Sequence, residues 1–95
     1  MKDIFDVVLT KNALKDLKIV PDYIAVKLWL WVDDVGHRGL SEVRKIPGYH
    51  DEPLQGIRNG QRSIRLNKSY RAIYIIKADD TIEFVEIKEI NKHKY

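Results

Sequence analysis

Three segments with the character of strands follow one another towards the end of the chain, at 62–66, 70–77 and 81–90, and the second and third are rich in β-branched and aromatic residues. Only short polar turns, at 67–69 and 79–80, separate them. Strands that are joined by such short turns pair with their neighbours along the chain. The sequence therefore predicts an antiparallel meander of three strands.

The residues before this meander have a strand pattern and then a helical one. A short apolar run at 4–9 predicts a first strand, and Thr10 is a good N-cap for a helix that extends to about residue 18. Pro21 and Asp22 suit the first turn of a second helix. Four apolar residues of that helix recur at helical spacing and predict a core-facing stripe: Ile24, Leu28, Trp31 and Val35.

The order β-α-α-β-β-β makes the predicted fold α+β, with the two N-terminal helices packed on one face of a mostly antiparallel four-stranded sheet. Ninety-five residues without repeats or low-complexity linkers predict a single domain, 1–95. A long connection rich in proline and glycine, at 47–61, precedes the meander. Structured loops of this length in small domains are often functional.

A second apolar strip lies beside the core-facing stripe of the second helix and consists of Tyr23, Val26 and Leu30. We interpret it as part of a wide core face. The alternative is a docking surface for a partner protein.

The positive charge of the chain is concentrated in one segment. Residues 54–78 contain six Lys or Arg and no acidic residue, whereas residues 1–53 and 79–95 each carry slightly more acidic than basic residues. The whole net charge of +3 thus comes from the segment that forms the predicted hairpin. A cationic stripe on a rigid sheet indicates a surface that holds phosphate.

The hairpin itself brings two arginines together. If 67–69 is a three-residue loop, Arg65 lies directly opposite Arg71, and both side chains project from the same face. Like charges in this arrangement are destabilising, so an anion such as phosphate would fit between them. A register slip of one residue would undo this inference. The alternative is that the arginines pair with three acidic residues of the last strand: Glu83, Glu86 and Glu89.

Two further clusters contain groups that transfer protons. The loop carries His50, Asp51 and Glu52 in succession, and the C-terminus carries His93 and Tyr95. Histidine and carboxylate side chains are the usual general acids and bases. The alternative interpretations are a solvated acidic turn and a polar tail.

The composition excludes several classes of site. The chain has no cysteine, which excludes disulfides, thiol catalysis and zinc–thiolate sites. Its three histidines lack the spacing of metal ligands, so we expect no metal. The N-terminus lacks the apolar segment of a signal peptide, and the longest apolar run, 23–32, is far too short to span a bilayer. We therefore expect a cytoplasmic protein.

Four pieces of sequence carry a family resemblance: 52–56 (EPLQG), 60–66 (GQRSIRL), 70–74 (YRAIY) and 93–95 (HKY). With these motifs the chain resembles the RelE/ParE superfamily of bacterial toxins of type II toxin–antitoxin systems. It is most similar in pattern to the ribosome-dependent mRNA interferases of the HigB, RelE and YoeB type. The predicted β-α-α-β-β-β order agrees with this superfamily over the whole chain.

The resemblance implies an endoribonuclease that cleaves mRNA in the ribosomal A site by attack of the ribose 2′-hydroxyl on the adjacent phosphate, without a metal or another cofactor. Such a reaction needs a base, cations for the developing phosphorane charge and an acid for the leaving oxygen. By position in the motifs, the resemblance assigns five catalytic residues: Glu52 as base, Arg71 and its helper Arg65 at the phosphate, His93 as acid, and Tyr95 as a group that orients the RNA or one of its nucleobases.

The remaining cationic and imidazole groups near these motifs are candidates for RNA binding: Arg58, Arg62, Lys68, His50 and Lys92. His50 is also close enough in sequence to Glu52 to act as an acid or a base. The separate roles of acid and base therefore stay open.

The partners that the resemblance implies are a cognate antitoxin, which would cover or distort the cationic face, and mRNA on the 70S ribosome; we expect neither a membrane nor a small-molecule partner. Two other functions compete with the interferase. One is inhibition of DNA gyrase, as in ParE-like members, and the other is non-catalytic binding of nucleic acid. Glu52, His93 and Tyr95 favour the nuclease over a gyrase inhibitor, which would not need them around the arginines. Against a non-catalytic binding module, the predicted strands lack a run of exposed aromatic residues that would stack single-stranded bases.

Overall fold

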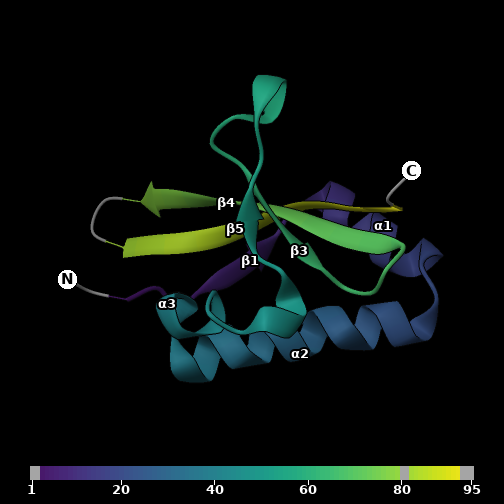
Figure 1. The fold of residues 1–95 in the computed structure, drawn as a ribbon, viewed down its shortest axis with the longest axis horizontal. Helices are drawn as coiled ribbons and strands as arrows, with labels where there is room; N and C mark the ends of the chain where they lie inside the picture. Colours follow the sequence, from purple (N-terminus) through teal and green to yellow (C-terminus); the bar gives the residue numbers. More distant parts are fainter. Residues whose placement is uncertain (1–2, 80–81, 93–95) are drawn as a thin grey trace.

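The computed structural model describes residues 3–79 and 82–92. A mixed sheet forms the centre of the fold, with the strand order β1-β5-β4-β3-β2 (Figure 1). The bounds of its strands are β1 Val7–Leu9, β2 Glu52–Pro53, β3 Arg62–Arg65, β4 Tyr70–Asp79 and β5 Ile82–Lys92. β1 is parallel to β5, and the other neighbours are antiparallel.

The predicted α+β class and the C-terminal meander are confirmed, but the predicted number of strands is too small. The described residues form five strands rather than four, because Glu52 and Pro53 pair with Ser63 and Arg62 of β3. A two-residue strand that contains a proline has no periodic signal of its own, so only its partner strand reveals it.

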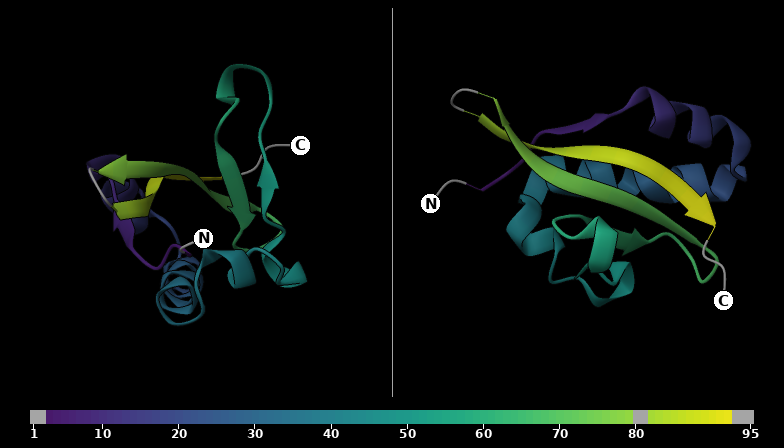
Figure 2. Two further views of the ribbon diagram at one scale, coloured as in Figure 1. Left: turned by 90° about the vertical axis from the view of Figure 1, so that its left-hand side faces the viewer. Right: turned by 90° about the horizontal axis from the view of Figure 1, so that it is seen from above.

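In the described part of the chain, three α-helices accompany the sheet: α1 Lys11–Ile19, α2 Asp22–Arg38 and α3 Leu40–Val43. Figures 1 and 2 show α2 running along one side of the sheet. The predicted stripe of α2 is confirmed, since Ile24, Leu28, Trp31 and Val35 are fully buried. Burial of each of the three aliphatic side chains stabilises the fold by roughly 1.5–3 kcal/mol.

The sheet contributes the other half of this core through alternating residues of its strands, among them Ile64, Leu66, Ala72, Tyr74, Val85 and Ile87. The rings of Trp31 and Tyr74 meet at the centre, with their centroids 5.3 Å apart. Because side chains alternate along a strand, the residues between these positions face away from α2.

The interpretation of Tyr23, Val26 and Leu30 as a wide core face is wrong. These side chains are 64%, 57% and 54% exposed. At 100° per residue they lie on the side of α2 turned away from the buried stripe, and the single sheet covers only one side of the helix. The alternative, a docking surface, stays a prediction.

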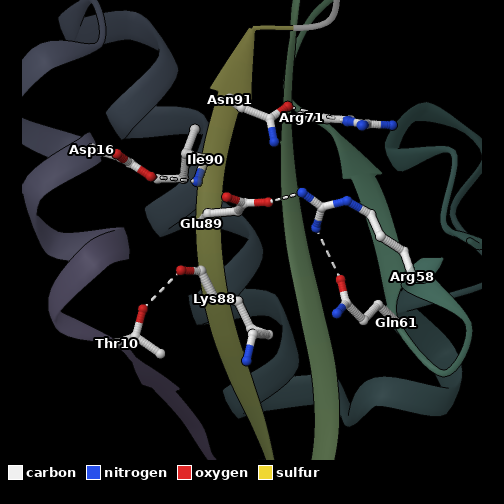
Figure 3. Close-up of polar contacts among 9 residues, drawn as sticks. All are labelled: Thr10, Asp16, Arg58, Gln61, Arg71, Lys88, Glu89, Ile90 and Asn91. Atoms are coloured by element: carbon white, nitrogen blue, oxygen red, sulfur yellow. Dashed lines mark hydrogen bonds and ion pairs between the residues drawn. The ribbon is translucent and has the colours of Figure 1, made fainter.

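The start of α1 also completes the edge of β5. Thr10 accepts a hydrogen bond from the backbone N–H of Ala13 through its hydroxyl oxygen (3.1 Å), as an N-cap does. The same hydroxyl donates to the carbonyl of Lys88 (2.8 Å), and Asp16 accepts from the N–H of Ile90 (2.9 Å) (Figure 3). Beyond the short β1, α1 thus supplies hydrogen-bond partners for the last strand.

Gly39 ends α2 with a φ of 86°, a conformation that glycine adopts without strain. A side chain there would also collide with Asp3. The Asp3 carboxylate accepts hydrogen bonds from the hydroxyl and the backbone N–H of Ser41 (2.6 and 3.0 Å), and the hydroxyl bond is the main cause of its lowered pKa.

The long connection before the meander contains short elements of its own. A 3-10 turn, η1 (Pro47–Tyr49), precedes β2, and a second, η2 (Gly56–Arg58), follows it. In Figure 1 the segment around η2 projects from the sheet on the side opposite α2. Within the described residues, no helix has both the length and the apolar character needed to cross a membrane.

Candidate functional site: a concave surface at the β3–β4 hairpin

The hairpin between β3 and β4 has the register that places two arginines side by side. The N–H of Leu66 donates to the carbonyl of Tyr70 (2.9 Å), so the loop has three residues. Oδ1 of Asn67 accepts hydrogen bonds from the backbone N–H groups of Ser69 and Tyr70 (2.7 and 2.8 Å), which fixes the turn. Arg65 therefore lies directly opposite Arg71, as the sequence predicts.

Both guanidinium groups belong to the face of the sheet turned away from α2, because their neighbours Ile64 and Ala72 are in the core. Arg71 donates through Nε to Oδ1 of Asn91 (3.2 Å). Within residues 3–79 and 82–92, neither Arg65 nor Arg71 forms an ion pair with a carboxylate. Two adjacent positive charges that no described carboxylate pairs with form an anion-binding arrangement.

A concavity of about 110 Å³ lies beside these arginines. It is lined by His50, Glu52, Ser63, Ile64, Arg65, Asn67, Lys68, Tyr70 and Arg71. The structure thus brings together both central arginines and two members of the loop cluster that the sequence indicated. Its volume suits a small polar group such as one phosphate, not a large apolar ligand.

The loop presents His50 and Glu52 to this concavity through an unusual backbone conformation. His50 has φ 50° and ψ 47°, and it is the only non-glycine residue with positive φ in the described ranges. Such a conformation costs of order 1–3 kcal/mol and is concentrated at functional sites. It turns the chain from η1 into β2.

Asp51, between these two residues, has a different role. Its carboxylate is fully buried and accepts hydrogen bonds from Nε of Arg62 (2.7 Å) and from the hydroxyl of Tyr74 (2.5 Å). Burial, together with this hydrogen bond, raises the pKa of Tyr74 well above its usual value. The interpretation of Asp51 as a member of an acid–base cluster is therefore wrong: it anchors the loop to the sheet.

Two of the arginines expected to bind RNA are engaged in ion pairs. Arg62 pairs with Asp51, and Arg58 contacts Oε1 of Glu89 at 2.6 Å while it donates to Gln61 (3.0 Å) (Figure 3). The ion-pair alternative that the sequence left open was for Arg65 and Arg71, and neither of them pairs with a described carboxylate; Glu89 pairs with Arg58 instead. RNA binding by Arg58 and Arg62 stays a prediction.

The remaining predicted site residues are two lysines and two residues of the C-terminus, and one of the lysines lines the concavity. Lys68 lines the concavity, whereas Lys92 is exposed at the end of β5, opposite Tyr70. His93 and Tyr95 lie outside the described residues. Sequence reasoning missed Asn91, although its register position opposite Arg71 could have been found by extending the pairing to the last strand.

A second contact holds the loop from the side of α2. The hydroxyl of Tyr49 donates to the Asp34 carboxylate (2.8 Å), and Nζ of Lys27 lies 5.0 Å from the centre of the Tyr49 ring. Burial and the hydrogen bond to Asp34 raise the pKa of Tyr49 to about 12. His50 therefore follows a residue that is fixed to the helical layer.

The raised pKa of Tyr49 predicts a loss of stability at alkaline pH. The unfolded chain releases this proton near the ordinary tyrosine pKa of 10, whereas the folded protein retains it until about pH 12. The stabilisation is thus complete below pH 10 and is lost as the pH rises towards 12. We expect the free energy of unfolding, measured by urea denaturation, to fall over this interval and to fall less in Tyr49→Phe. If the free energy of unfolding fell equally steeply with pH in both proteins, the raised pKa of Tyr49 would be contradicted.

The sequence profile of the ParE toxin of type II toxin-antitoxin systems (parDE) matches residues 7–90, nearly the whole chain. The chain belongs to the ParE toxin family. The resemblance to the RelE/ParE superfamily is thereby confirmed, and the protein is a toxin of a type II toxin–antitoxin system. No curated protein sequence matches the chain.

Solved toxin structures share the fold at low sequence identity. YafQ from E. coli strain BL21(DE3) is 20% identical, with a TM-score of 0.70 and coverage of 93% of this chain and 92% of YafQ. The YoeB/ParE toxin from Agrobacterium tumefaciens is 17% identical (TM-score 0.68; coverage 94% and 99%). A chain of the toxin–antitoxin complex RelBE2 from Mycobacterium tuberculosis is 22% identical (TM-score 0.67; coverage 95% and 99%). These likenesses show a RelE-like fold.

Proposed function

We propose that this toxin is a metal-independent endoribonuclease that cleaves mRNA in the A site of the ribosome. The observation that carries the proposal is the concavity at the β3–β4 hairpin, where Arg65 and Arg71 flank a space that Glu52 and His50 also reach. Two guanidinium groups supply charge for a phosphate, and a carboxylate and an imidazole supply proton transfer.

In the proposed reaction the ribose 2′-oxygen attacks the adjacent phosphorus while the bond from phosphorus to the 5′-oxygen breaks. Glu52 takes the proton of the 2′-hydroxyl, and Arg71, helped by Arg65, stabilises the charge that develops on the phosphate oxygens. An acid returns a proton to the leaving 5′-oxygen. The products are a 2′,3′-cyclic phosphate and a 5′-hydroxyl.

The acid has two candidates, His93 and His50. The family resemblance points to His93, whereas the position of His50 in the lining of the concavity supports a role for His50. Separate glutamine substitutions of the two histidines distinguish them, because loss of the acid removes the alkaline limb of the pH–rate profile.

Primer extension on a defined mRNA, incubated with the purified toxin with and without translating ribosomes, tests the proposal. We expect cuts only with ribosomes, at in-frame positions, and none with Glu52→Gln. Cuts on free RNA would show instead a nuclease that needs no ribosome. The absence of cuts in both reactions would overturn the nuclease.

Inhibition of DNA gyrase is the second candidate function, and the match to the ParE family profile favours it. A gyrase inhibitor needs the cationic surface for binding but not the proton-transferring groups. Supercoiling assays with purified gyrase separate the two functions, because an inhibitor would block supercoiling and its Glu52→Gln variant would block it equally well.

We also propose a cognate antitoxin as the protein partner. Two of the similar structures support it, since they are the toxin–antitoxin complexes RelBE2 from Mycobacterium tuberculosis and DinJ–YafQ from E. coli. An acidic partner segment over the concavity would compete with phosphate for Arg65 and Arg71. Co-expression of the neighbouring gene product and co-purification with this chain test the pairing.

A further inference from the structure

We infer that Asn91 is a positioning residue that holds Arg71 in place for an anion without neutralising its charge. The inference deepens the proposed function, because it explains how the sheet keeps one arginine available for phosphate. It rests on a comparison of Arg71 with the neighbouring Arg58, whose side chain reaches the same strand β5.

The two arginines meet different partners on β5. Arg58 contacts the carboxylate of Glu89 at 2.6 Å, whereas Arg71 donates to the amide oxygen of Asn91 at 3.2 Å (Figure 3). Glu89 and Asn91 are two residues apart, so they lie on the same face of the sheet. The positive charge of Arg58 is therefore balanced by its partner, and that of Arg71 is not.

The geometry of the Arg71 contact leaves most of its donors available. A guanidinium carries five N–H donors, of which only the one on Nε points to Asn91. Figure 3 shows the far end of the Arg71 guanidinium directed away from β5. Arg71 lines the concavity together with Arg65 and Glu52. The amide thus orients the group and leaves the two terminal nitrogens for bidentate contact with a phosphate.

Asn91 leaves the positive charge of Arg71 available for an anion because its amide side chain is uncharged. A carboxylate of nearly the same shape at this position would form an ion pair with Arg71 and compete with any bound anion. Asn91→Asp is therefore a sharp test, because it keeps the side-chain size and adds a favourable internal contact. If the only role of Asn91 were to pack within β5, this substitution would leave the phosphate affinity unchanged.

The test measures phosphate binding directly. In 15N-labelled protein, the Nε–H resonance of Arg71, assigned by its absence in Arg71→Lys, is followed while inorganic phosphate is added. We expect a saturable shift in the wild type and an at least tenfold weaker phosphate affinity in Asn91→Asp. The matched control is Asn12→Asp, which adds the same charge at an exposed position of α1 and should leave the affinity unchanged.

A second readout uses a short RNA with 2′-O-methyl groups, which the toxin cannot cleave. The logarithm of the RNA association constant falls linearly with the logarithm of the salt concentration. In Asn91→Asp this slope should become less steep by about 0.7, the contribution of one phosphate contact on a single strand. Thermal unfolding of each variant verifies that it is folded. Asn91→Ala should weaken RNA binding less than Asn91→Asp, because the alanine variant loses the hydrogen bond that orients Arg71 but leaves the positive charge of Arg71 without an ion-pair partner at position 91.

The inference would be overturned if Asn91→Asp bound phosphate as tightly as the wild-type protein does. It would also be overturned if the Arg71 resonance of the wild-type protein showed no saturable shift with phosphate. These outcomes are independent of RNA cleavage. If Arg71 binds phosphate as described and no mRNA is cut with ribosomes, the role of Asn91 stands and the proposed nuclease is lost.

Discussion

We expect that replacement of Arg71 by alanine abolishes the growth arrest caused by this toxin while it leaves the fold intact. Arg71 lies beside Arg65 at the concavity, and within the described residues its side chain makes one hydrogen bond, to the neutral Asn91. Loss of one preorganised group that stabilises transition-state charge lowers the rate constant of cleavage by roughly 10²–10³-fold. Its loss from a partly exposed position changes the free energy of unfolding by only about 0.5 kcal/mol or less.

The measurement is single-turnover cleavage of mRNA on programmed ribosomes, with growth on plates as the cellular readout. Lys77→Ala is the matched control, because Lys77 is a cation on the same strand that pairs with Glu86 (3.2 Å). It should retain cleavage near the wild-type rate. A fully toxic or an unfolded Arg71→Ala protein would show that the phosphate site has been placed wrongly.

We expect the largest loss of stability from replacement of Asp51 by alanine. The buried carboxylate pairs with Arg62 and accepts the hydrogen bond of the buried Tyr74 hydroxyl. Removal of one member of a buried ion pair costs roughly 3–5 kcal/mol. Because the Arg62 side chain is 21% exposed and keeps contact with water, we expect a loss near the lower end of this range. The segment that carries His50 and Glu52 should lose its side-chain anchor to the sheet at the same time, while the pairing of β2 with β3 remains.

Chemical denaturation measures this change in the free energy of unfolding, and cleavage assays measure its effect on the site. Asp33→Ala is the control, since the Asp33 side chain is exposed and, among the described residues, pairs only with His37, so its loss should change stability by about 0.5 kcal/mol or less. A loss below about 1 kcal/mol in Asp51→Ala would contradict the anchoring role. Asp51→Asn keeps an acceptor for Tyr74 and should be less damaging than Asp51→Ala.

Much of the architecture followed from the sequence, because its causes are local. The stripe from Ile24 to Val35 has the period of a helix, and Thr10 has the side chain of an N-cap. The three-residue loop after Leu66 sets the register of the hairpin, which in turn places Arg65 opposite Arg71. Each of these features depends on residues within a few positions of one another.

The features that the sequence did not predict depend on contacts between distant segments. The two-residue strand β2 exists only because β3 pairs with it, and Asp51 is buried because Tyr74, 23 residues away, lies beneath the loop. In the same way, the exposure of Leu30 follows from how much of α2 the sheet covers.

By itself, the sequence determined the α+β class, the core stripe of α2 and the pair of arginines on one face of a hairpin. Only the tertiary structure decided which arginines are neutralised, that Asp51 is an anchor, and that Asn91 contacts Arg71. The reason is physical: periodicity and turn length act between neighbours along the chain, whereas the balance of a charge depends on which carboxylate or amide the fold brings within hydrogen-bond distance.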